Sequence, residues 1–91
     1  MNAVVVRVSF NDVETAERML EEEIVPMVSQ IPGFVAGYWT RAQDRSNGMS
    51  MVVFESEEGA QAMASRLNDE GVPGDAVKLE SVEVREVVAS A

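Results

Sequence analysis

The residue types best suited to chemistry lie together in the middle of the chain, at Tyr38, Trp39 and Arg41. Aromatic faces pack against the rings of a phenolic ligand, and a guanidinium group donates hydrogen bonds to its oxygen. These three side chains predict a binding site for a small apolar or aromatic molecule. The alternative is that Tyr38 or Trp39 packs in the core or in a subunit interface, where aromatic residues are enriched.

A fourth candidate is Arg7, a charged residue inside the apolar segment 3–10 (AVVVRVSF). If its side chain faces a cavity, it would bind a carboxylate or an enolate. Otherwise it pairs with a carboxylate of a neighbouring strand, such as Glu80 or Glu83, or of a second subunit. We include Arg7 among the candidate ligand-binding residues and leave both interpretations open.

The methionines allow two interpretations as well. Thioether side chains are flexible and polarisable, so they either line an adaptable apolar pocket or fill gaps in a core. The residues concerned are Met19, Met27, Met49, Met51 and Met63.

The composition excludes several kinds of catalytic centre. The chain has no histidine and no cysteine, so it lacks the commonest general base, the commonest metal ligand and any thiol nucleophile. Its serines have no histidine partner for a triad. The acidic runs at 21–23 and 57–58 occupy consecutive helical positions, which point in different directions and cannot converge on one ion. We expect no metal site and no cofactor.

The charge of the chain argues against nucleic acid and membranes as partners. The formal net charge is −9, from 16 acidic and 7 basic residues, and a field of that sign repels phosphate backbones and anionic bilayers. No apolar run approaches the ~20 residues needed to span a bilayer. The apolar start of the chain lacks the basic flank and the cleavage site of a signal peptide. We expect a cytoplasmic protein.

Hydrophobic periodicity divides the chain into six elements. Strands are predicted at 3–10, 34–42, 49–55 and 76–88, and helices at about 12–30 and 57–68.

Individual residues mark the ends and irregularities of these elements. Asn11 is placed to cap the first helix, with Glu14 as its capping-box partner, and Ser56 to cap the second. Pro26 lies inside the first helical pattern, where it must kink the helix or start a new turn. Asn47-Gly48, at the end of the polar segment 43–48, is typical of a tight hairpin turn. The alternation of the last strand slips near Ser81, which predicts a bulge or a bend.

The element order is β-α-β-β-α-β, in one domain over residues 1–91. This order is the ferredoxin-like α+β arrangement, and right-handed crossovers put both helices on one face of a four-stranded antiparallel sheet. Segment 3–10 is apolar on both sides, so the other sheet face also needs a cover. We expect a second copy of the chain there, because two sheets packed face to face form a barrel between subunits.

The chain resembles the dimeric α+β barrel superfamily, and within it the small proteins grouped with the antibiotic-biosynthesis monooxygenases. The likeness lies in Pro26, in Ile31-Pro32-Gly33-Phe34, and in Val52–Glu58 leading into Ala60 and Ala62. The resemblance implies a homodimer with a cavity between sheet and helices. In some members it also implies cofactor-free oxidation of polycyclic phenols.

Two positions depart from the family pattern. Met63 stands where many members have a histidine, and the only tryptophan is Trp39, on the second strand rather than the second helix. Haem-degrading members use Asn, Trp and His, so the absence of histidine argues against that activity. Quinone-forming members use Asn, Trp, Tyr and Arg, and segment 38–41 supplies the last three residue types.

Two functions follow from these observations. The first is a homodimeric module that holds a small apolar or aromatic ligand. The second is a cofactor-independent monooxygenase acting on a phenolic or polycyclic substrate.

Overall fold

The computed structural model describes all residues from Met1 to Ala91 and has the predicted β-α-β-β-α-β order. The four strands form one antiparallel sheet in the order β2-β3-β1-β4, so the ferredoxin-like α+β fold is confirmed. The elements are β1 (Asn2–Phe10), α1 (Val13–Met19), the π-helical turn η1 (Leu20–Ile24), α2 (Val25–Ser29), β2 (Phe34–Arg41), β3 (Asn47–Phe54), α3 (Glu57–Glu70) and β4 (Val77–Glu86).

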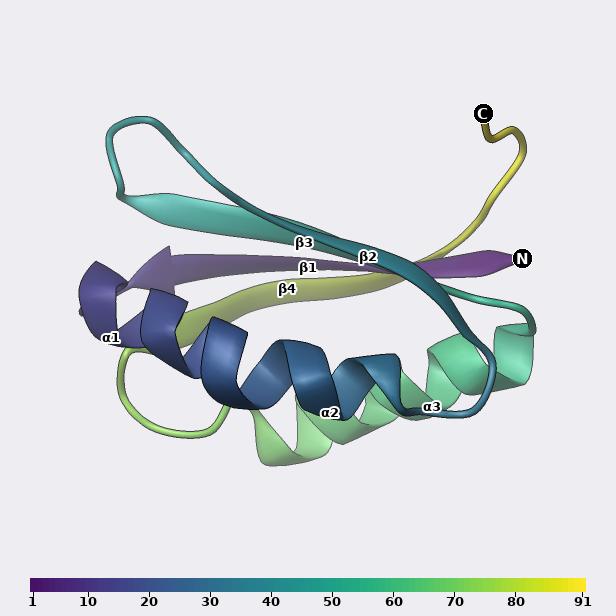
Figure 1. Cartoon of the computed structure of the whole chain (residues 1–91), viewed down its shortest axis with the longest axis horizontal. Coiled ribbons are helices and arrows are strands. Elements are labelled where there is room, and N and C mark those ends of the chain that lie inside the picture. Colours follow the sequence, from purple (N-terminus) through teal and green to yellow (C-terminus); the bar gives the residue numbers. More distant parts are fainter.

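The fold has two layers, and one side of the sheet carries no other element. Figure 1 shows the run α1-η1-α2 and the helix α3 on the same face of the sheet, with the opposite face bare. No helix is both long and apolar enough to cross a bilayer. The uncovered face is the one for which the sequence predicts a second copy of the chain.

Pro26 starts a new helical segment, as one of the two predicted outcomes. It lies in the first turn of α2, where its missing N–H does least harm.

The turn before Pro26 is wide: the N–H of Val25 donates to the carbonyl of Leu20, five residues earlier. A regular helix advances 3.6 residues per turn. The wide turn lets residues spaced four apart stay on one side, and this side faces the sheet.

The cap of the first helix differs from the prediction. Asp12, not Asn11, is the N-cap, and its carboxylate accepts hydrogen bonds from the N–H (3.1 Å) and the hydroxyl (2.7 Å) of Thr15. Asn11 instead donates from its side chain to the carbonyl of Asp75 at 3.0 Å. The prediction failed because the helix begins only at Val13, and Asp12 directly before it has the extended backbone that a cap requires. The second cap, Ser56, is confirmed, and accepts from the N–H of Gly59 at 3.2 Å.

The Asp12 cap makes the stability of the first helix depend on pH. The side-chain and backbone hydrogen bonds from Thr15 hold the pKa of Asp12 below its ordinary value of 3.8. A carboxyl with a lowered folded-state pKa stabilises the fold above its unfolded pKa, and this contribution disappears as the pH falls through the folded value. Replacing Asp12 with alanine should therefore lower the melting temperature at neutral pH, and the gap to the wild type should close below about pH 4.

Thermal melts followed by circular dichroism at a series of pH values measure this gap. Glu22→Ala is the control, because it removes one negative charge from an exposed position of the same helical run. A gap for Asp12→Ala that stays constant into acid would contradict the assignment of the cap.

The hairpin between β2 and β3 turns before Asn47, earlier in the chain than predicted. Asn47 and Gly48 are already in β3, opposite Ser9 and Val8. The reversal is at Asp44–Ser46, where Arg45 has a φ of 64°. The carboxylate of Asp44 accepts from the N–H (3.0 Å) and the hydroxyl (2.6 Å) of Ser46, and these bonds lower the pKa of Asp44. This is an Asx turn, which needs no Asn-Gly pair.

Gly48 is required by packing rather than by the turn. A Cβ atom there would lie 2.8 Å from the ring of Phe10 and 2.8 Å from the carbonyl oxygen of Thr40.

The predicted irregularity at Ser81 is confirmed: Arg7 pairs with Ser81 and Val8 with Leu79, so Glu80 is the extra residue of a bulge.

The space between sheet and helices is filled at one end. Val4, Val52 and Phe54 are completely buried there, against Val28, Ala60 and Ala64. Phe34 meets Phe54 edge to face, with ring centroids 6.5 Å apart. This packed end lies at the first half of β1, whereas the second half of β1 borders a cavity.

Candidate functional site

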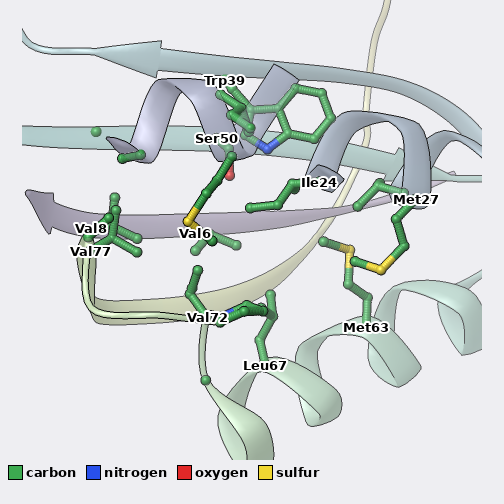
Figure 2. Close-up of a pocket in the computed structure, with 18 of the residues that line it drawn as sticks. Val6, Val8, Ile24, Met27, Trp39, Ser50, Met63, Leu67, Val72 and Val77 are labelled. Atoms are coloured by element: carbon green, nitrogen blue, oxygen red, sulfur yellow. The ribbon is translucent and has the colours of Figure 1, made fainter. Parts of the chain in front are cut away.

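A cavity of about 780 Å³ lies between the sheet and the helices. Its size is that of a small-molecule site, for which a range of about 300–1,000 Å³ is usual. Figure 2 shows its walls, with Val6 and Val8 from β1, Trp39 from β2, Met27 from α2 and Met63 from α3. It is partly open to solvent and mostly apolar.

The helical wall follows from the wide turn described above. Ala16, Leu20, Ile24 and Val28 are four residues apart and all border the cavity. A strict 3.6-residue period would rotate such a series away from the sheet. Hydrophobic periodicity predicted the helix but gave these residues no part in a site. The repeated spacing of four next to a proline is the signal that could have identified this wall.

Trp39 forms the aromatic wall of the cavity and depends on Gly37. A Cβ atom at position 37 would lie 2.6 and 2.7 Å from two atoms of the indole ring. The ring therefore lies directly over the glycine, on the same side of β2, where any other side chain would displace it. This placement leaves an aromatic surface beside the cavity.

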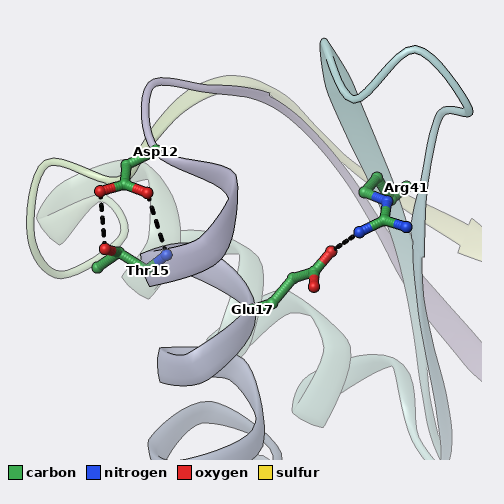
Figure 3. Close-up of polar contacts among 4 residues, drawn as sticks. All are labelled: Asp12, Thr15, Glu17 and Arg41. Atoms are coloured by element: carbon green, nitrogen blue, oxygen red, sulfur yellow. Dashed lines mark hydrogen bonds and ion pairs between the residues drawn. The ribbon is translucent and has the colours of Figure 1, made fainter.

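Arg41 and Glu17 form an ion pair that joins β2 to α1, and both residues line the cavity. Figure 3 shows the guanidinium group reaching from the end of β2 to the helix. Their side chains are 40% and 43% exposed, so water screens the pair and its contribution to stability is about 0–1 kcal/mol. Its effect is on position, because it fixes a donor group at the rim.

The four candidate ligand-binding residues are divided between the two faces of the sheet. Trp39 and Arg41 line the cavity, whereas Tyr38 is 68% exposed on the bare face. Adjacent strand residues point to opposite faces, so Tyr38 and Trp39 cannot share one site within a single chain. Tyr38 lies instead by a shallow depression of about 70 Å³ with Val5 and Met51.

Arg7 also lies on the bare face. It is exposed between Met49 on β3 and Ser81 on β4. Its neighbours in β1, Val6 and Val8, line the cavity and Arg7 does not, as strand alternation requires.

The alternative in which Arg7 pairs with Glu80 or Glu83 is not found in the structure. Glu80 accepts a hydrogen bond from Ser9 at 2.9 Å, and Glu83 pairs with Arg85 at 2.8 Å. Pairing with a second subunit stays a prediction.

The methionines are also divided between the cavity and the bare face of the sheet. Met19, Met27 and Met63 border the cavity, and Met51 lies on the bare face. Met49, opposite Arg7 near the end of the sheet, borders both the cavity and the shallow depression. No group of three or more carboxylates is close enough to hold a metal ion. The arrangement can hold an apolar, flat molecule against Trp39, with charged groups only at the rim.

No family model matches the sequence, and no curated protein matches it. Solved structures do match the fold. HapK from Hahella chejuensis superposes with a TM-score of 0.69 at 11% identity, over 100% of this chain and 96% of HapK. SnoaB from Streptomyces nogalater, a cofactor-independent oxygenase, superposes with a TM-score of 0.68 at 12% identity, over 98% of this chain and 94% of SnoaB.

A third structure, a dimeric ferredoxin-like protein from an uncultured marine organism, has a TM-score of 0.68 at 13% identity, over 100% of this chain and 98% of that one. Similarity at this level of identity shows the fold. The fold is therefore the one that the predicted resemblance implies, and this chain shares it with SnoaB and with the dimeric ferredoxin-like protein.

Proposed function

We propose that this protein is a homodimer that binds a flat apolar or aromatic molecule in the cavity between its sheet and its helices. The observation that carries the proposal is the cavity of about 780 Å³, with Trp39 on its wall and Arg41 at its rim. The residues that are buried most completely lie at the other end of the domain, so the cavity is not part of the tightly packed core. A cavity of this volume with mostly apolar walls suits a molecule of two to three fused rings.

The bare face of the sheet supports the homodimer. Tyr38, Met49 and Met51 are 68%, 43% and 44% exposed there, and such residues are typical of subunit interfaces. A contiguous apolar patch on a small domain usually marks an interaction site. The dimeric ferredoxin-like protein with the same fold supports the same assembly. In that dimer Tyr38 and Arg7 would meet the partner subunit rather than the ligand.

The second candidate function is cofactor-independent oxygenation of a phenolic substrate. The similarity to SnoaB, an oxygenase of this kind, favours it. An ionised phenol held in the cavity would supply the electrons: one atom of dioxygen would enter the ring to give a quinone, and the other would leave as water. The guanidinium of Arg41 would stabilise the negative charge of the phenolate oxygen.

Titration with menadione, a neutral two-ring quinone, tests the binding proposal. Trp39 is the only tryptophan, so quenching of its emission reports on the cavity. We expect saturable quenching with one site per chain and a dissociation constant of about 1–100 μM. N-acetyltryptophanamide, measured in parallel, corrects for collisions and absorption.

A matched pair of substitutions localises the bound probe. Ala16→Phe places a ring inside the cavity and should abolish saturable quenching. Ser65→Phe adds the same ring at an exposed position of α3 outside the cavity lining and should have no effect. Linear quenching in the wild type, or equal binding to both variants, would reject the proposal. Dioxygen uptake with 1,5-dihydroxynaphthalene separates the second candidate, because a binding module consumes none.

A further inference from the structure

The charged side chains around the cavity are unequally paired. Five of them border it, and four form two ion pairs: Arg41 with Glu17, and Arg66 with Glu70, whose Nε–Oε2 distance is 2.9 Å. The fifth is Glu21, on η1, which takes part in no ion pair and no side-chain hydrogen bond. Glu21 is thus the only charged side chain at the cavity without a partner, and its charge is negative.

No basic residue of its own helix forms an ion pair with Glu21. Arg18, three residues earlier, forms no ion pair, and the neighbours Glu22 and Glu23 are exposed and acidic. The chain as a whole carries a net charge of −9. A surface field of that sign raises the local concentration of cations and lowers that of anions.

An anionic ligand would gain little at this rim. The charges of Arg41 and Arg66 are already balanced by Glu17 and Glu70, so an anion bound to the free donors of either guanidinium would lie beside a carboxylate of its own sign. A cationic ligand meets no such repulsion at Glu21, because this carboxylate has no basic partner.

We infer that the cavity selects aromatic molecules that carry a basic nitrogen, with Glu21 as the counter-charge. This inference rests on the proposed binding function and names the chemical class of its ligand. The aromatic part lies against Trp39 and the apolar walls, and the protonated amine lies at the rim by η1. Glu21 is a specificity-determining residue in this arrangement, whereas Arg41 and Arg66 are held by their own partners.

Three probes with the same ring system test the charge preference. Calorimetric titrations of the wild-type protein use 2-naphthylmethylammonium, 2-naphthalenemethanol and 2-naphthoate, which are cationic, neutral and anionic at neutral pH. We expect the cation to bind most tightly, about tenfold better than the anion at low salt, with the ratio falling as the ionic strength rises.

Two charge-matched variants localise the effect. Glu21→Gln should weaken the cationic probe about three- to fivefold and leave the neutral probe unchanged. Glu22→Gln removes the same charge one position away, outside the cavity lining, and should change both probes little. Both positions are exposed, so the variants should fold, and circular dichroism checks this.

The outcomes separate the two proposals. Equal binding of the three probes, tighter binding of the anion, or equal effects of the two variants would overturn the charge selectivity while leaving the cavity as a binding site. Failure of the neutral probe together with the other two would overturn the proposed function itself.

Discussion

Replacing Gly37 with alanine is expected to displace the Trp39 ring and to weaken menadione binding by about tenfold or more. The added Cβ atom would stand 2.6 and 2.7 Å from two ring atoms of Trp39, well inside van der Waals contact. The indole has two ways to move, away from the strand into the cavity or out of it toward solvent. Either movement removes the flat aromatic wall against which the probe rests.

The emission of Trp39 and a menadione titration measure this effect on the same sample. Ser65→Ala is the control, because it changes a small side chain at an exposed position of α3 outside the cavity lining. That variant should keep the wild-type emission and affinity. If Gly37→Ala keeps them too, the indole does not lie over position 37 and the aromatic wall is wrongly assigned.

Replacing Met51 with glutamate is expected to convert the proposed dimer into a monomer at micromolar concentration. Met51 is 44% exposed on the bare face of the sheet and neighbours Tyr38 in the strand pairing. A carboxylate buried in a largely apolar interface must lose its hydration. Because a twofold interface contains each residue twice, the cost is also counted twice, and we expect a dimer at least about a hundredfold weaker.

Gel filtration with light scattering gives the mass of both forms. Gln61→Glu is the control, since it adds the same charge on an exposed position of α3 outside the sheet face. It should remain dimeric. A monomeric wild type would reject the homodimer, and a dimeric Met51→Glu would place the interface on another surface.

The fold was predictable from the sequence because each of its elements has an independent local signal. The apolar segment 3–10 predicted β1, Ser56 predicted the start of α3, and the phase slip at Ser81 predicted the bulge of β4. The errors arose where two residues compete for one role. Asp12, not Asn11, caps the first helix. Asn47-Gly48 has the sequence of a tight turn, but the glycine is required there by packing.

The site was less accessible to sequence reasoning. Tyr38, Trp39 and Arg41 are neighbours in sequence, but strand alternation assigns Tyr38 to the other face, and Arg7 follows it there. The partner of Arg41 comes from a helix 24 residues away, a pairing that depends on how α1 stands over the sheet. The wide turn before Pro26 depends on tertiary packing in the same way.

The packed end of the domain and the end that holds the cavity tolerate different substitutions as the sequence changes. Val4, Val52 and Phe54 hold the fold together and do not border the cavity. Substitutions at half-buried wall positions such as Met63 and Leu67 can therefore alter what is bound at less cost to the fold, because the completely buried side chains lie elsewhere. The fold itself tolerates extensive sequence change, as the full-length superposition on HapK at 11% identity shows.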